Sequence, residues 1–227
     1  MKKIFTLITF VALALGAQAQ LISWTESDVA SAGSLNGKTF GDNSFSLSIN
    51  DTAGKIAIDA NNAWFGDATV QTKFTHRLKT GGKSSSKNSL KLTAASAGKI
   101  KIYVRTGSNS ATDRNLILTQ GGNELYNKVI VEADAIMVKG LDSADPEKET
   151  KVYPAVVVDV EAGDLDITYP TNGLNFYGFE FVSPSGVNNV KAAAAQKTGA
   201  TYTLDGQQVG ADYKGIVVVD GKKFVQE

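Results

Sequence analysis

The chain has 227 residues, with 23 basic and 23 acidic side chains, one histidine and no cysteine. A formal charge of zero argues against a general nucleic-acid binder, because such proteins carry a basic excess. Without cysteine no disulfide can form, so stability depends on a buried core, for which this length and a hydrophobic content of 42% are sufficient.

The amino-terminal residues have the pattern of a cleaved signal peptide. Lys2 and Lys3 form a positive start, residues 4–15 are an apolar run, and residues 17–19 (Ala-Gln-Ala) have the small side chains of a cleavage site. We therefore expect residues 1–19 to be removed and the mature chain to be secreted, to the periplasm or the cell surface. Loss of the two lysines leaves 21 basic and 23 acidic residues, which is a formal charge of −2. The rest of the sequence contains no second apolar run long enough to span a membrane.

Short segments of alternating apolar residues follow along most of the chain. A period of two is typical of strands that bury one face, and Gly, Asn, Asp and Ser separate the segments. The expected strands lie near residues 45–49, 56–58, 74–78, 90–92, 100–104, 116–119, 125–131, 153–160, 165–169 and 174–182. They predict an all-β fold, a β-sandwich of jelly-roll type, for residues 20–183.

Other segments of this region are too polar or too rich in turn residues for a buried strand. Residues 142–150 are expected to form a long exposed loop. Trp64 lies in the turn-rich segment 61–66, and Trp24 precedes the first expected strand. Each tryptophan either closes the end of the core, which we favour, or offers a flat ring to a sugar.

The composition changes after residue 183. Residues 184–199 are rich in small side chains and are expected to form a linker. Residues 200–227 predict a small β unit of two hairpins, with Asp205-Gly206 and Asp220-Gly221 as turn dipeptides.

Two resemblances concern these regions. Residues 204–209 (Leu-Asp-Gly-Gln-Gln-Val) and 214–223 resemble the carboxy-terminal sorting tails of exported Bacteroidota proteins, which implies export or cell-surface attachment machinery of the type IX pathway as a partner. Residues 164–182, with Arg105 and residues 113–118, resemble β-sandwich modules attached to Bacteroidota pectate lyases and related polysaccharide-degrading enzymes. The chain lacks the long β-helix that carries catalysis in those enzymes. The resemblance therefore implies an accessory, carbohydrate-related role and transfers no active site.

The residues themselves predict no catalytic constellation. His76 alternates with Phe74 and Leu78 on the inward face of an expected strand and is interpreted as a hydrogen-bonded core imidazole. A histidine triad or a zinc site would need partners that the sequence lacks. A pair of carboxylates remains an alternative for a glycosidase, although no spacing selects a pair. The available carboxylates are Glu124, Glu132, Asp134 and Glu161.

Calcium is the cofactor that the residue types favour, because hard cations take carboxylate and backbone oxygens. The weak candidates are Asp42, Asp59, Asp142 and Asp145. None has EF-hand spacing, and the preferred interpretation is that these residues form turns and a solvated loop.

The most informative pattern lies opposite the apolar alternation. Lys73, Arg77 and Lys79 lie on one expected strand, Lys91 on the next, and Lys99, Lys101, Tyr103 and Arg105 on the third. If these strands are neighbours in one sheet, their cations share a face. Such a face either is an ordinary solvated surface or binds the carboxylates of an acidic sugar polymer while an aromatic ring stacks on a sugar. The candidate ligand-binding residues are Arg77, Lys101, Tyr103, Arg105 and Trp64.

Three classes of function follow from these patterns. The favoured one is a secreted, non-catalytic carbohydrate-binding or adhesion module whose partner is a polysaccharide, with a pectic polymer as the acidic example. A polysaccharide lyase or glycosidase with an unrecognised site and a structural envelope protein are the alternatives.

The first prediction concerns export. Expression in a Gram-negative host should yield a mature chain that begins at Gln20, because the cleavage motif ends at Ala19. Amino-terminal sequencing of the envelope and medium fractions checks this, and an intact Met1 in those fractions would contradict it.

Overall fold

The computed structural model describes residues 19–183, 201–203, 208–210, 213–219 and 222–226. The chain divides into two compact units, Met1–Ser185 and Gly186–Glu227. The expected linker, nearly all of the expected signal peptide and both turn dipeptides of the carboxy-terminal hairpins lie outside the described residues.

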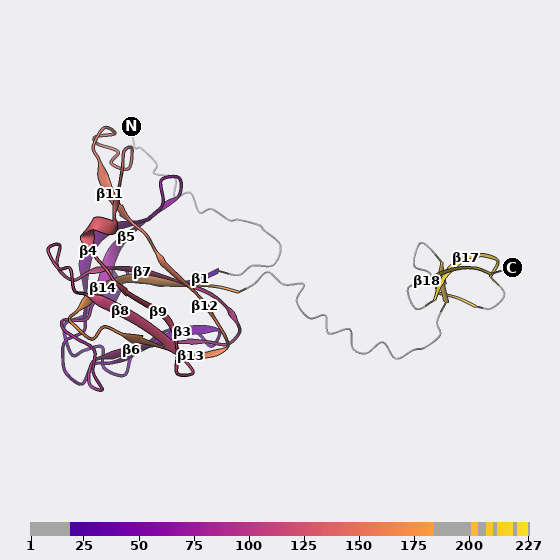
Figure 1. The fold of residues 1–227 in the computed structure, drawn as a ribbon, viewed down its shortest axis with the longest axis horizontal. Helices are drawn as coiled ribbons and strands as arrows, with labels where there is room; N and C mark the ends of the chain where they lie inside the picture. The colour runs from indigo at the N-terminus through magenta and orange to yellow at the C-terminus, as the bar shows by residue number, and fades with distance from the viewer. Residues whose placement is uncertain (1–18, 184–200, 204–207, 211–212, 220–221, 227) are drawn as a thin grey trace. The chain divides into compact units, whose positions relative to one another are not determined.

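The first unit contains two β-sheets (Figure 1). The larger sheet has the order β10 (Ile136–Val138), β11 (Thr150–Tyr153), β4 (Ala57–Gly66), β5 (Gln71–Lys79), β14 (Leu174–Val182), β7 (Gly98–Thr106) and β12 (Val156–Val160), and β1 (Ala19–Ser23) also pairs with β14. The smaller sheet has the order β2 (Thr39–Gly41), β3 (Phe45–Asn50), β6 (Ser89–Ala94), β13 (Gly163–Thr168), β8 (Asn115–Gln120) and β9 (Asn123–Val129). Two single-turn 3₁₀ helices, η1 (Glu26–Asp28) and η2 (Glu132–Asp134), lie between strands.

The chain passes repeatedly from one sheet to the other, as at β3 to β4, β5 to β6, β6 to β7 and β13 to β14. This crossing is typical of jelly rolls. The prediction of an all-β sandwich followed by a small β unit is confirmed.

The main core lies between the two sheets and follows the alternation of the sequence. Leu47 of β3, Leu92 of β6 and Ile102 of β7 are each 0% exposed, and their sequence neighbours face away from this core. Trp24 is also part of this cluster and packs edge-to-face on Phe179, with ring centroids 6.2 Å apart. Trp24 therefore closes the core, as its favoured interpretation predicts.

A second, smaller cluster lies on the other side of the larger sheet. Tyr103 of β7 and Tyr177 of β14 belong to it, although their neighbours along the strands pack in the main core. Tyr177 projects here by regular alternation with Leu174 and Phe176, and the bulge between Phe176 and Gly178 in the pairing with β7 returns Phe179 to the main core. A Cβ at position 178 would lie 2.9 Å from the ring of Phe74, so glycine allows this close approach.

Two expected elements differ from the structure. The expected strand 153–160 is divided into β11 and β12, which lie at different places in the larger sheet. Pro154 accounts for the division, because proline cannot donate a ladder hydrogen bond. Residues 61–66 are not a loop but the distal part of β4, where a register shift between Ala60 and Ala63 accommodates the two asparagines.

The second unit is a four-stranded sheet in the order β16 (Gln208–Val209), β15 (Thr201–Thr203), β17 (Gly215–Val219) and β18 (Lys222–Gln226). The pairs β15–β16 and β17–β18 are antiparallel, as expected for two hairpins. Val217 is 2% exposed, whereas Ile216 and Val225, which face each other across β17 and β18, are 47% and 71% exposed.

The two tryptophans generate a prediction about stability. Trp24→Ala should lower the free energy of unfolding by about 3–5 kcal/mol, because it removes a ring that is 3% exposed from the main core. Trp64→Ala should cost much less, because Trp64 is only partly buried. Urea unfolding of both variants measures the difference, and equal losses would contradict this placement.

Candidate functional site

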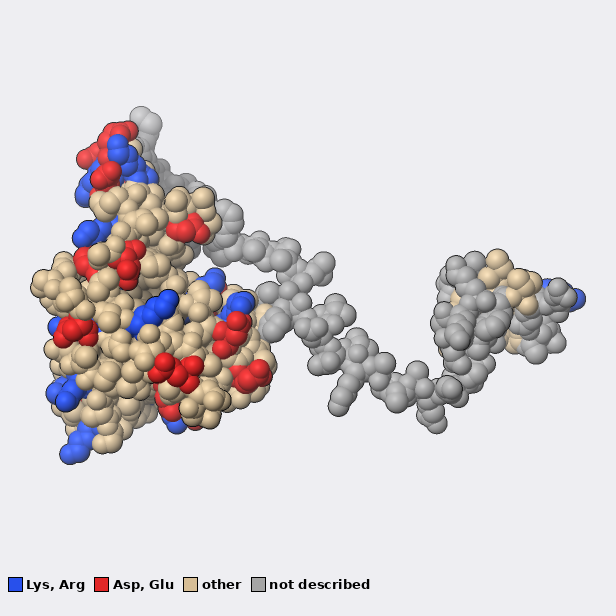
Figure 2. All heavy atoms as spheres, in the orientation of Figure 1, with Lys and Arg blue, Asp and Glu red and all other residues tan. Residues whose placement is uncertain are grey.

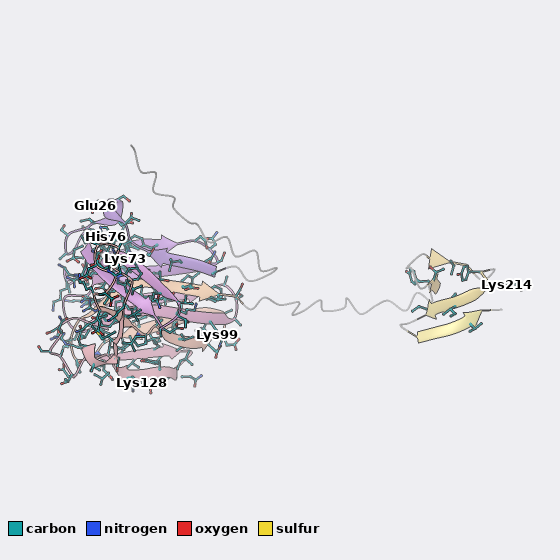
Figure 3. All side chains as sticks on the ribbon, turned by 90° about the horizontal axis from the view of Figure 1, so that it is seen from above. Glu26, Lys73, His76, Lys99, Lys128 and Lys214 are labelled. Atoms are coloured by element: carbon teal, nitrogen blue, oxygen red, sulfur yellow. The ribbon has the colours of Figure 1, made fainter. Side chains whose placement is uncertain are left out.

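The structure separates the cations that the sequence analysis considered for one shared face. Lys91 lies on β6 in the smaller sheet, and β14 lies between β5 and β7 in the larger one. The condition for a shared face, that the three strands are neighbours in one sheet, is therefore not met. The reason is that β14, which follows much later in the chain, pairs with both β5 and β7 and separates them. In Figure 3, Lys73 and Lys99 lie in different parts of the unit.

Most of these cations are paired with carboxylates. The Nζ of Lys99 lies 2.5 Å from Asp159, and that of Lys101 lies 3.2 Å from Glu180. Figure 2 shows basic and acidic side chains interspersed over the visible face of this unit, without a large area of one sign. Exposed pairs of this kind contribute about 0–1 kcal/mol each to stability, but they cancel much of the local positive potential.

Asp59 pairs with Arg77, a candidate binding residue, and with Lys79 of the same strand. It accepts hydrogen bonds from Arg77 Nε at 2.8 Å and from Lys79 Nζ at 2.7 Å. Burial acts to raise the pKa of Asp59, but the hydrogen bonds and charges of Arg77 and Lys79 outweigh it and lower that pKa below its ordinary value. Asp59 is therefore ionised at neutral pH and holds Arg77 in a fixed position on the sheet.

Tyr103 does not offer its ring to a ligand. It is 7% exposed, its ring lies 4.7 Å from that of Phe74 between centroids, and its hydroxyl donates a hydrogen bond to Glu180. Burial, followed by the hydrogen bond to Glu180, raises the pKa of Tyr103, so the hydroxyl stays protonated. The expectation that Tyr103 shares an exposed face with the lysines is corrected, because distal β4 and β5 supply aromatic rings that cover it.

Glu132 of η2 is the centre of a second ionic network. It accepts hydrogen bonds from Arg105 Nη2 at 3.2 Å, Lys151 Nζ at 2.9 Å and the Tyr153 hydroxyl at 2.7 Å. The guanidinium of Arg105 also lies 4.2 Å from the centre of the Tyr153 ring, within cation–π range. Burial opposes ionisation of Glu132, but these donors and the Arg105 charge together lower its pKa.

Trp64 and Arg105 meet at a groove of about 440 Å³, the tryptophan groove, which is formed by β4, β5, β7, β11 and the loop before β11. The upper end of the unit in Figure 1 carries β11. The charged side chains that line the groove are Lys73, Arg105, Asp142, Lys148, Glu149 and Lys151. Two of the five expected binding residues, Trp64 and Arg105, therefore share one concave site.

Lys73 is the cation of the tryptophan groove that is free to bind an anion. It faces Trp64 across β4 and β5, and its Nζ lies 5.7 Å from the centre of the Trp64 ring. Among the described residues no carboxylate lies within ion-pairing distance of Lys73, whereas Lys148 pairs with Asp142 at 2.9 Å and Lys151 pairs with Glu132. Four cations line the groove against two lining carboxylates, so a net positive charge lies beside a partly exposed aromatic ring.

The calcium candidates are dispersed and their oxygens have other partners. Asp42 accepts hydrogen bonds from the backbone of Ser44, and Asp145 from the backbone of Glu147. Over residues 19–183 and the described parts of the carboxy-terminal unit, no three His, Cys, Asp or Glu side chains are grouped closely enough to hold a metal ion. The geometry of Asp42, Asp59, Asp142 and Asp145 thus fits turns and ion pairs better than a calcium site.

His76 has the environment that its strand position predicts. It is 7% exposed, its Nδ1 lies 2.9 Å from the Thr75 hydroxyl, and its Nε2 lies 3.0 Å from Glu26 of η1. Figure 3 labels Glu26 and His76 at the same corner of the unit. The interpretation of His76 as a hydrogen-bonded core imidazole is confirmed.

Among the described residues, the carboxylates considered for catalysis do not face one another in a pair across a groove. Glu124 lies on β9 and bonds to Asn127, whereas Glu132 is engaged with Arg105, Lys151 and Tyr153. A general acid of a glycosidase needs a raised pKa, and the pKa of Glu132 is lowered. Glu132 is therefore suited to positioning Arg105 and Lys151 rather than to proton transfer.

Sequence reasoning missed the role of Lys151, Tyr153 and the loop before β11. They reach Trp64 because β11 pairs with β4 in parallel, with Val152 opposite Trp64 and Tyr153 opposite Phe65. Such a long-range pairing has no local sequence signal. Pro154, which separates Tyr153 from the following strand, is the one available hint.

The comparisons with known proteins place the chain in no family. No protein-family model matches the chain, and no curated protein matches it. One solved chain is described as "The complexity of the Ruminococcus flavefaciens cellulosome reflects an expansion in glycan recognition". It is 13% identical in sequence to this chain, with a TM-score of 0.37. The match covers 75% of this chain and 97% of the solved chain. At that TM-score the likeness carries no argument about function. In the described part of the chain, no helix is long and apolar enough to cross a membrane.

The Glu132 network generates a prediction about pH. Glu132→Gln should lower the free energy of unfolding at pH 7 by about 3 kcal/mol, because it removes the partner of two cations in a site where the Glu132 side chain is 14% exposed.

A carboxylate whose folded-state pKa is lowered stabilises the protein above its unfolded pKa, about 4.5 for Glu, and loses that contribution as the pH falls through the folded value. The stability difference between wild type and Glu132→Gln should therefore shrink below about pH 4.5. Urea unfolding from pH 3 to 7 measures it, and a pH-independent difference would show that the network does not act through the charge of Glu132.

Proposed function

We propose that the β-sandwich is a secreted, non-catalytic module that binds an acidic polysaccharide in the tryptophan groove. The observation that carries the proposal is the pairing of the partly exposed Trp64 ring with the Lys73 ammonium, which has no carboxylate partner among the described residues.

The groove combines the two contacts that an acidic sugar needs. An aromatic ring offers a flat apolar surface to the carbon face of a sugar, and a few placed polar groups fix its orientation. Lys73 supplies a charge for a sugar carboxylate, and Arg105 supplies a planar guanidinium that a carboxylate can bind with two hydrogen bonds. Glu132 keeps Arg105 and Lys151 at the edge of the groove before a ligand arrives.

The charge of the groove favours an acidic over a neutral polymer. Its lining cations exceed its lining carboxylates, whereas the cations of β7 outside it, Lys99 and Lys101, are paired one to one with acidic residues. The ligand class is therefore a polymer of uronic acids, of which pectic polygalacturonate is the example to test. The Ruminococcus flavefaciens neighbour is described with glycan recognition, the same broad class of ligand, but the proposal rests on the groove.

Export is the second part of the proposal. The signal-peptide pattern and the tail-like residues 204–223 support secretion and attachment to the cell surface through an export machinery. A module of this kind, in a Bacteroidota-like context, would hold its partner polysaccharide near polysaccharide-degrading enzymes.

The test is retention on polygalacturonate at low salt. Wild-type mature chain should be retarded, and retention should weaken as salt rises, because the charged contacts are screened. Trp64→Ala and Lys73→Gln should each lower the affinity about tenfold or more, as expected for the central contacts of a small site. Lys99→Gln, an exposed lysine outside the groove, is the control that should not change it.

Two outcomes would overturn the proposal. Retention that survives Trp64→Ala and is lost in Lys101→Gln would move the site to the face of β7 that the sequence first indicated. Equal retention on a neutral glucan, indifferent to salt, would remove the acidic specificity.

A further inference from the structure

A second hollow of about 290 Å³ lies at the end of β5 that carries Lys79, whereas Lys73 of the tryptophan groove lies near the start of that strand. Its polar lining residues are Arg77, Lys79, Arg114, Asn172 and Asn175. Apart from Leu174, the rest of its lining is glycine, at positions 81, 82, 107 and 173, so we call it the glycine hollow.

The glycine hollow carries the chemistry of an anion site. Three of its lining residues are cations and none is acidic, although Asp59 and Asp113 pair with them from outside the lining. Arg114 donates from Nη1 to the Gly173 carbonyl at 3.1 Å, while its buried Nε lies 3.6 Å from Asp113, an ion pair that is too long for a hydrogen bond. A bound oxyanion could therefore give Arg114 a shorter contact than the one it has with Asp113.

The groove and the hollow are joined by one row of side chains. Arg105 faces Asn175 across β7 and β14, and Asn175 faces Lys79 across β14 and β5. All three point away from the main core, because Val104, Phe176 and Leu78 beside them along the strands pack inside it. Arg105 lines the tryptophan groove, whereas Asn175 and Lys79 line the glycine hollow.

The row is short enough for one oligosaccharide. Adjacent strands lie about 4.8 Å apart, so Arg105 and Lys79 are separated by about 10 Å. Tyr177, two residues further along β14, is 0% exposed, and its hydroxyl donates a hydrogen bond to Asn61. Asn175 is only 8% exposed, so a ligand would pass over it and contact the charged ends of the row, Arg105 and Lys79.

We infer that the glycine hollow is a second subsite for the acidic glycan proposed above, an inference that rests on the proposed function. It binds the carboxylate of another uronic acid residue of the same chain, through Arg77, Lys79 and Arg114. Three of its four glycines allow backbone segments to pack closely, because a Cβ at Gly81, Gly107 or Gly173 would lie 2.3, 2.4 or 2.9 Å from a neighbouring backbone atom. The module then recognises an oligosaccharide long enough to reach both sites.

The experiment is titration calorimetry of the mature chain with galacturonic acid oligomers, from the disaccharide to the hexasaccharide. Wild type should bind the hexasaccharide more tightly than the disaccharide. Lys79→Gln and Arg114→Lys should each lower the hexasaccharide affinity about fivefold, the factor for about 1 kcal/mol, and leave the disaccharide affinity unchanged.

Lys91→Gln is the matched control, because Lys91 is 47% exposed and Lys79 is 42% exposed, and each pairs with an aspartate on a neighbouring strand. Melting curves show whether Arg114→Lys, which removes part of a contact to Gly173, still folds. If Arg114→Lys does not fold, Lys79→Gln alone still tests the second subsite.

The outcomes separate the two claims. Equal affinity of wild type for all lengths, or an equal loss in Lys91→Gln, would overturn the second subsite and leave the tryptophan groove standing. Failure of wild type to bind any oligomer would overturn the proposed function together with the subsite.

Discussion

The burial of β14 on both faces is the constraint on which the rest of the unit depends. Phe176 and Phe179, on either side of the bulge, pack in the main core, while Tyr177 packs with Phe65 in the second cluster. Because β14 lies between β5 and β7, it separates strands that are close in sequence. It also aligns Asn175 with Lys79 and Arg105, so the same strand that completes the core provides the middle of the proposed binding row.

Charge pairing decides which surface is available to a ligand. Lys101 is matched by Glu180, whose side chain is 17% exposed, and Arg77 by Asp59, which is 31% exposed. Such pairs fix side chains in place but leave little net potential. Lys73 differs because its cross-strand neighbour is Trp64, an aromatic ring rather than a carboxylate. The tryptophan groove is therefore the primary site for an anion, and the glycine hollow, whose three cations exceed their two carboxylate partners, is the secondary one.

The fold could be predicted from the sequence because alternation reports burial on one face, as at Phe45, Leu47 and Ile49. The candidate site was only partly predictable. The alternation correctly predicted that Arg77 and Arg105 point away from the core. It does not report strand order, and for that reason Lys91 was grouped with cations of the other sheet. The alternation also does not report that a second apolar cluster covers the outer face of the larger sheet. Tyr103 is buried in that cluster. Trp64 and Arg105 meet through pairings between distant segments, for which no local pattern exists.

The account depends most on whether a glycan contacts Trp64 rather than the paired lysines of β7. A nitrogen-15 spectrum of the mature chain contains two indole signals, from Trp24 and Trp64, and Trp24 is an internal reference because it is buried in the main core. Titration with a galacturonic acid trisaccharide should shift the Trp64 indole signal and leave that of Trp24 in place. Shifts confined to the backbone amides around Lys101 and Glu180, with the Trp64 signal unmoved, would contradict the account.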